Sequence, residues 1–189
     1  ASTSEGDIVC GAVVLAVGHS ARDTYSMLMD KGFLLTPKPF SVGVRIEHLQ
    51  ENIDRAMYGD LAGHPKLGRA EYNLSYTDDG RGVYTFCMCP GGEVVAAASE
   101  EGGVVVNGMS RYARDGKNAN AAVAVSVRPE DCGNDVRRAI EFQRSLERSA
   151  FVLGGANYAA PIQTVGDFLR DELCHEPSVV EPSYMNGHC

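Results

Sequence analysis

The sequence lacks the glycine fingerprint G-x-G-x-x-G, which holds the pyrophosphate of a dinucleotide in many flavin and nicotinamide enzymes. It also lacks a membrane span, because its apolar run from Ile8 to Val17 is too short to cross a bilayer. No Ser-His-Asp, His-x-x-His or paired-carboxylate arrangement stands out. The residues therefore indicate neither a complete dinucleotide site nor one of the common hydrolytic centres.

An excess of basic residues is absent as well. The net charge is -8 over 189 residues, which would repel phosphates, so we expect neither nucleic acid nor an anionic membrane surface as a partner. A bound nucleotide remains compatible with this charge, because a few local amides can hold one. Hydrophobic residues make up 44% and charged residues 22%, as is ordinary for a soluble globular protein with a sizeable core.

The cysteines show no framework spacing that would indicate disulfides. The six are Cys10, Cys87, Cys89, Cys132, Cys174 and Cys189. No basic region marks a signal peptide, since the first residues include Glu5 and Asp7. We therefore expect free thiols and a cytoplasmic location, where the cytosol keeps thiols reduced.

The most informative segment present runs from Val13 to Thr24. It begins as an unbroken apolar run, typical of a strand buried on both faces of a parallel sheet, and it turns at Gly18 into a helix. Ser20 and Asp23 have the spacing of a capping box. This is half of a nucleotide-binding βα unit, although a plain βα turn explains the local pattern equally well. The chain offers few neighbours for such a strand, so we interpret it as a piece of a larger protein.

The rest of the chain predicts an α+β fold, with an antiparallel or mixed sheet and packed helices. Apolar alternation and turn signals predict strands at 40–48, 72–76, 83–89, 93–99, 104–107 and 121–127, and helices at 21–31, 49–59 and 135–153. We expect the four strands between 72 and 107 to form an antiparallel meander. The predicted domains are a stub of a cofactor domain at 1–36, a middle domain at 37–172, and a linker or tail at 173–189.

Cys87 and Cys89 precede a Pro-Gly-Gly turn. In a regular strand, residues two apart share a face, so both thiols should point the same way. They are interpreted as small buried hydrophobes, and a shared metal ion or a redox role is the alternative. A structural zinc site needs four ligands, whereas Cys174-His175 and His188-Cys189 are isolated pairs, so no metal site is predicted.

The segment from Asn107 to Asn120 is polar and basic. Arg111, Arg114 and Lys117 could meet an anion, and a solvated surface loop is an equally good interpretation.

Arg45 and Glu47 share a strand face and are expected to pair at the surface. His48 is interpreted as a residue at a helix entry rather than as a catalytic base.

Several motifs together resemble one family, a poorly characterised group of FAD-dependent dehydrogenases in the two-dinucleotide-binding flavoprotein superfamily. These motifs are Val14 to Thr24, Lys38-Pro39-Phe40, Gly43 to His48, Tyr84 to Gly92, Ala98-Ser99-Glu100-Glu101, Asn107-Gly108-Met109-Ser110 and Gly166-Asp167-Phe168-Leu169. The resemblance runs from about Ile8 to Leu169, which is nearly the whole chain.

The resemblance implies a much longer protein, whose FAD domain is assembled from an N-terminal glycine-rich unit and a C-terminal closing segment. This chain looks like the middle region between them. Ala16-Val17-Gly18 would then correspond to the second FAD-domain motif, which makes Gly18, His19 and Ser20 candidate cofactor-binding residues in the full-length protein. We do not expect the isolated chain to bind FAD, and no catalytic residue carries over from the resemblance.

The sequence therefore predicts the middle, substrate-facing domain of an FAD-dependent oxidoreductase that is inactive by itself. Cys87, Cys89, Asn107 and Ser110 are the candidates for facing an unidentified small-molecule substrate. The other expected partners are the remaining segments of the FAD domain and, through the apolar edges of Val13 to Val17, a second copy of the chain. A non-catalytic binding or interaction module is the alternative function, and a cysteine-ligated metal module is a third.

Overall fold

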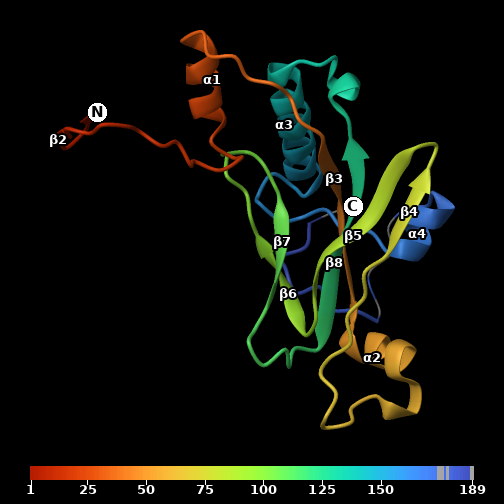
Figure 1. Ribbon diagram of the computed structural model, residues 1–189. Coiled ribbons are helices and arrows are strands. Elements are labelled where there is room, and N and C mark those ends of the chain that lie inside the picture. Colours follow the sequence, from red (N-terminus) through yellow and green to blue (C-terminus); the bar gives the residue numbers. More distant parts are fainter. Residues whose placement is uncertain (174–176, 178, 188–189) are drawn as a thin grey trace. The chain divides into compact units, whose positions relative to one another are not determined.

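The computed structural model describes residues 1–173, 177 and 179–187 (Figure 1). Contacts within it divide the chain into two units, residues 1–35 and 36–189. The helices and antiparallel sheets confirm the predicted α+β class. The assignment of residues 1–36, 37–172 and 173–189 to a cofactor-domain stub, a middle domain and a tail stays a prediction.

The first unit contains a small two-stranded ladder and one helix. The ladder pairs β1 (Ser2–Thr3) with β2 (Gly6–Asp7), and the helix is α1 (Arg22–Asp30). The helix ends close to the predicted residue 31, and Gly32 follows it with φ +83° and an N–H that donates to the carbonyl of Met29 at 3.0 Å. Glycine adopts this left-handed conformation without a steric penalty, which is why it stops a helix.

The strand predicted from Ile8 to Val17 does not form, and this expectation was wrong for the chain by itself. Val9 is fully exposed and Val14 is 86% exposed, and residues 8–17 have no ladder partner. A strand buried on both faces needs neighbours on both sides, and within its own unit the segment finds none. Its composition is that of an interior strand, but its surroundings here are those of a surface.

The predicted capping box at the start of α1 is also wrong. The N-cap is Ala21, and no side chain caps the helix. The Asp23 carboxylate accepts a hydrogen bond from the N–H of Thr24 at 2.8 Å, while Ser20 Oγ lies 3.4 Å from Nε2 of His19. The helix forms without the reciprocal hydrogen bonds that the spacing indicated.

The second unit is built on a four-stranded antiparallel sheet. Its members, in spatial order, are β3 (Phe40–Leu49), β8 (Asn118–Val127), β5 (Arg81–Cys89) and β4 (Ser75–Asp78). A separate hairpin joins β6 (Gly92–Ala96) to β7 (Val106–Ser110). The predicted meander is therefore wrong, because β8 pairs with both β3 and β5 in place of a β5–β6 pairing. Ala119 and Ala121 of β8 are fully buried, as suits a central strand.

The β4–β5 hairpin forms where the sequence predicted it. Asp79 and Gly80 both have positive φ, +44° and +70°, which is the signature of a type I′ turn. That turn matches the right-handed twist of the strands, so the Asp-Gly pair sets the register of the hairpin.

The helices of the second unit lie toward opposite ends of this sheet (Figure 1). They are α2 (Gln50–Tyr58) with the short η1 (Gly59–Leu61), then η2 (Pro129–Cys132), α3 (Val136–Leu153) and α4 (Val165–Arg170). Among the described helices, none is long and apolar enough to cross a lipid bilayer.

The apolar core lies where α3 meets the sheet. Val127, Cys132 and Ala139 are its buried members, and Phe40 and Val42 pack against them. Asp135 caps α3: its carboxylate accepts a hydrogen bond from the N–H of Arg138 at 2.8 Å.

The apolar side chains of α3 are only partly buried: Ala139 is 9% exposed, whereas Phe142, also in the first half of the helix, is 38% exposed. Leu146 is 44% exposed and Leu153 is 61% exposed. Glu141 and Arg144 pair at 3.3 Å, and Arg144 also makes two shorter bonds to Glu100, at 2.7 and 2.8 Å. Arg144 therefore ties the loop after β6 to the helix instead of only facing water.

Candidate functional site

Arg45 of β3 is the centre of a polar cluster between the sheet and the β6–β7 hairpin. Its Nη1 donates to Oδ1 of Asn120 at 2.7 Å and to the Cys87 carbonyl at 3.5 Å. Its Nη2 donates to Oδ1 of Asn107 at 3.2 Å. The guanidinium thus links β3, β5, β7 and β8, and we refer to Arg45, Cys87, Cys89, Asn107 and Asn120 as the Arg45 cluster.

The two cysteines of the cluster do not share a face, contrary to the prediction. The ladder between β5 and β8 shifts register between Phe86 and Cys89, and Cys87 has φ +50°. A bulge of this kind inserts a residue and breaks the alternation of a regular strand. As a result Cys87 is exposed, whereas Cys89 is only 6% exposed.

Burial raises the pKa of the Cys89 thiol, and the nearby Cys87 adds to the effect. Arg45 acts in the opposite direction but does not outweigh them. The Cys89 thiol donates to the carbonyl of Cys87 at 3.3 Å. A thiol with a raised pKa stays protonated at neutral pH, so Cys89 is a weak nucleophile and the favoured interpretation as a small buried hydrophobe fits it.

We expect iodoacetamide at pH 8 to alkylate Cys87 at least about tenfold faster than Cys89, because the thiolate is the nucleophile and only Cys87 is accessible. Tandem mass spectrometry of the peptide that carries both cysteines measures the two rates. Exposed Cys10 and buried Cys132 are the internal references for fast and slow reaction. Equal rates at 87 and 89 would contradict the bulged geometry.

The four predicted substrate-facing residues come together around this cluster. Cys87, Cys89 and Asn107 belong to it, and Ser110 lies beside it, where its hydroxyl donates to the carbonyl of Pro90 at 2.8 Å. Gly108 lies against the cluster: a Cβ there would lie 2.9 Å from Sγ of Cys89. That these residues face a substrate stays a prediction.

Sequence reasoning missed Arg45 and Asn120. Arg45 was expected to pair with Glu47, but the Glu47 carboxylate instead accepts bonds from Nδ2 of Asn118 at 2.9 Å and from the N–H of Ser183 at 3.1 Å. The available signal was an asparagine inside the alanine- and valine-rich strand β8, since a buried amide needs a polar partner.

A second buried network joins α2 to the segment at Ala70 and to the Pro-Gly-Gly turn at Gly91. Gln50 is 1% exposed; its amide nitrogen donates to Asp54 at 2.8 Å and to the Ala70 carbonyl at 2.9 Å, and its amide oxygen accepts from the N–H of Gly91 at 2.8 Å. Asp54 also accepts from the N–H of Ala70 at 2.8 Å and from Arg69 at 2.9 Å. The network therefore fixes the Pro-Gly-Gly turn against α2.

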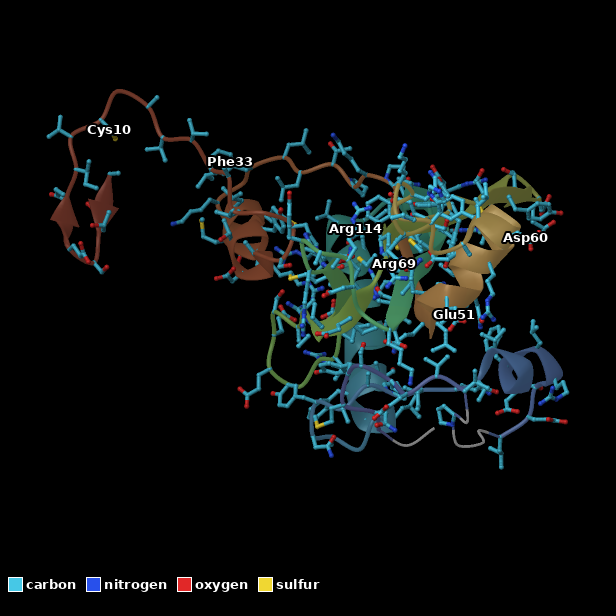
Figure 2. The ribbon with its side chains drawn as sticks, turned by 90° about the horizontal axis from the view of Figure 1, so that it is seen from below. Cys10, Phe33, Glu51, Asp60, Arg69 and Arg114 are labelled. Carbon is cyan, nitrogen blue, oxygen red and sulfur yellow. The ribbon has the colours of Figure 1, made fainter. Side chains whose placement is uncertain are left out.

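The predicted basic loop is shorter than expected and its arginines have carboxylate partners. Strand β7 extends to Ser110, and β8 begins at Asn118. Arg111 pairs with Glu93 and Arg114 with Glu71, each at 3.1 Å. Figure 2 shows Arg69 and Arg114 close together, and the carbonyl of Arg114 accepts a bond from Nε of Arg69 at 3.2 Å. These contacts favour the solvated loop over an anion site there.

His48 lies at the end of β3, one residue before Leu49 and the start of α2. Its Nε2 lies 2.8 Å from the hydroxyl of Tyr72. Burial lowers the pKa of His48 and raises the pKa of Tyr72, so both side chains are neutral at pH 7.

Gly18, His19 and Ser20 lie in the first unit, just before α1. Gly18 has φ +76°, and its carbonyl accepts a bond from the Tyr25 hydroxyl at 2.7 Å, but a Cβ at Gly18 would meet no atom within 4 Å. A nucleotide site needs this turn to sit at the end of a sheet strand, and that strand is not formed here. These residues therefore do not by themselves fit a flavin.

A metal centre finds no support among the described residues, where no group of three or more His, Cys, Asp or Glu side chains could hold an ion. The Cys174-His175 and His188-Cys189 pairs lie outside the described residues.

Comparison with known protein families assigns the chain. Residues 39–189 match the family described as FAD-dependent protein, C-terminal domain-like. The chain belongs to this family. The link to FAD-dependent proteins that the motifs predicted is thereby confirmed, while the superfamily and the middle position within the longer protein stay predictions.

One curated relative is much longer than this chain. An uncharacterised protein of Clostridium beijerinckii is 54% identical to it over 185 residues. The aligned region covers 96% of this chain but 35% of that protein. The chain therefore spans about a third of the length of its relative.

Proposed function

We propose that this chain is the substrate-facing domain of a longer FAD-dependent oxidoreductase, joined at residues 1–36 to a piece of the flavin domain, and that it is inactive by itself. In the intact protein FAD would supply the redox chemistry, and this domain would shape the pocket beside it. We also place the protein in the cytoplasm, in keeping with the free thiols of Cys10, Cys87, Cys89 and Cys132.

The observation that carries this proposal is the exposed apolar run from Ile8 to Val17. It has the composition of an interior strand but no partner strand, and Val9 and Val14 face solvent. Exposing so many apolar side chains is unfavourable by about 25 cal/mol for each Å² of apolar surface. Segments of the longer protein that pair with this run would remove that cost and complete the turn at Gly18.

The family assignment and the greater length of the relative support the same proposal. The family is one of FAD-dependent proteins, and a relative nearly three times as long has room for the flavin-binding segments that this sequence lacks. The Arg45 cluster, with its exposed Cys87 and Asn107, is the surface that we propose faces the substrate.

Titration with FAD, followed by the quenching of flavin fluorescence, tests the proposal. We expect the full-length Clostridium beijerinckii protein to bind FAD stoichiometrically and the chain alone to show no saturable quenching up to about 100 μM. Light scattering on the same samples should show that the chain alone associates through its exposed run.

Stoichiometric binding by the chain alone would contradict the role of the missing segments, because it would mean that the turn at Gly18 suffices. Failure of the full-length relative to bind FAD would contradict the flavoenzyme assignment and would favour a non-catalytic binding module.

A further inference from the structure

The charge of Arg45 is met only by neutral acceptors. Its three hydrogen bonds go to the side-chain oxygens of Asn120 and Asn107 and to the carbonyl of Cys87. No carboxylate of the described residues forms an ion pair with it, since Glu47, the acidic residue two positions along β3, is bonded to Asn118 and Ser183. A half-buried guanidinium without a counter-charge is a binding element for an anion.

The donors of Arg45 are not all used. A guanidinium carries five N–H donors, and three of them account for the bonds just described. Nε is buried and has no hydrogen-bond partner among the described residues. Nη2 keeps a second hydrogen beyond the one it gives to Asn107. Because Nε and Nη2 share one edge of the planar group, they form the fork that receives two oxygens of a carboxylate.

The rest of the cluster is short of acceptors as well. Asn120 is completely buried. Its Oδ1 accepts the bond from Arg45, but its Nδ2 has no partner in the part of the chain that the structure describes. Cys89 adds no negative charge, because burial keeps its thiol protonated. Buried donors without acceptors are rare in folded proteins, and a bound ligand is one of the standard explanations for them.

Asn107 is the group that a ligand would displace. It is exposed on β7, and its Oδ1 accepts a bond from Nη2 at 3.2 Å, at the long end of the range, and one from the N–H of Gly108 at 2.9 Å. That oxygen occupies the place of a ligand oxygen but carries no charge. Rotation of the Asn107 side chain would free Nη2 and the N–H of Gly108 for a ligand oxygen, and a carboxylate bound at Nη2 would lie on the guanidinium edge that Nε shares. The rotated side chain would leave its Nδ2 available as a further donor.

We propose that Arg45, through its Nε and Nη2, and Asn107 form a binding site for the carboxylate group of a small organic acid. The role of this site as the substrate anchor rests on the proposed function. A planar carboxylate is favoured over phosphate because the site offers one guanidinium edge and one amide, whereas phosphate sites add several backbone N–H groups in a nest or at a helix N-terminus.

Succinate is the probe, and the side-chain Nε–H resonance of Arg45 in the ¹⁵N-labelled chain is the readout. We expect a saturable shift with a Kd of about 1 mM, as suits a fragment that makes few contacts. Arg45→Gln should weaken binding at least about tenfold, followed by the backbone shifts of β7, since the loss of a bidentate charged contact is worth a factor of this size. Asn107→Ala removes the competing Oδ1 together with the Nδ2 donor, and because the charged Arg45 fork carries most of the binding, this variant should still bind succinate saturably.

Arg111→Gln is the matched control, because Arg111 lies at the end of the same hairpin but already pairs with Glu93. It should leave the shift unchanged. If circular dichroism shows that Arg45→Gln does not fold, the succinate titration of Asn107→Ala tests the proposal instead, since this variant changes an exposed side chain and keeps the arginine.

Three results would overturn the proposal: no saturable shift, loss of binding in folded Asn107→Ala, or tighter binding of inorganic phosphate than of succinate. The experiment contains no flavin, so its outcome is independent of the FAD titration. If this chain binds succinate but the full-length relative does not bind FAD, the carboxylate site is supported and only its role as a substrate anchor is contradicted.

Discussion

Replacing Asp54 with alanine is expected to lower the free energy of unfolding by about 2–4 kcal/mol, because the change leaves two buried donors without an acceptor. The carboxylate accepts bonds from the Ala70 N–H and from the Gln50 amide, each at 2.8 Å, and it pairs with Arg69 at 2.9 Å. The side chain is 7% exposed, so water cannot replace these bonds.

Urea unfolding followed by circular dichroism measures this effect. Asp60→Ala is the matched control, since Asp60 is exposed on η1 just after α2, and it should change the stability by less than about 0.5 kcal/mol (Figure 2). An Asp54→Ala variant as stable as the control would show that the network does not hold the turn at Gly91.

The Asp54 carboxylate should also affect how the free energy of unfolding changes with pH under acidic conditions. Burial alone would raise the pKa of Asp54, but hydrogen bonds from Ala70, Gln50 and Arg69 together outweigh it and the pKa is lowered. A group whose pKa is lower in the folded state stabilises the fold above its unfolded pKa of about 3.9, and this contribution is lost as the pH falls through the folded value. Asp54→Ala should therefore lose less stability than the unmodified chain below about pH 4.

Local signals were enough to predict some of these elements. The Asp79-Gly80 pair determines its own turn, and α3 ends at Leu153, where the helix was predicted to end, because Gly154 and Gly155 follow it. The pairing of β8 depends instead on residues that are distant in the sequence. Its alanines and valines suit any buried strand. Which strands pair with its two edges therefore depends on how well β3, β5 and β6 each fit against it.

The candidate site was only partly predictable for the same reason. The sequence pointed to Cys87, Cys89, Asn107 and Ser110 as candidates because they stand in glycine- and proline-rich contexts, and their role stays a prediction. The bulge at Cys87 breaks the alternation by which residues two apart in a strand share a face. No residue type at this position indicates a bulge from the sequence. Arg45 looked like half of a surface ion pair, because its true partners lie 62 and 75 positions along the chain.

Gly108→Ala is the second change with a large expected effect. It tests whether β7 must lie directly on the Arg45 cluster. A Cβ at this position would overlap Oδ1 of Asn120 and Nη1 of Arg45 and would lie 2.9 Å from Sγ of Cys89. Asn120 and Cys89 are buried and cannot move aside freely. We expect the free energy of unfolding to fall by about 1–3 kcal/mol, the usual cost of overpacking a closed site.

A change in Cys89 reactivity distinguishes displacement of β7 from a general loss of stability. If the hairpin shifts to accommodate the methyl group, Cys89 loses its cover and should react faster with iodoacetamide under native conditions, while buried Cys132 near α3 should not. Gly68→Ala is the control, since a Cβ there meets nothing within 4 Å, and it should alter stability by less than about 0.5 kcal/mol. If Gly108→Ala left both stability and Cys89 protection unchanged, β7 would not press on the cluster, and Arg45 would have room for a ligand without displacing Asn107.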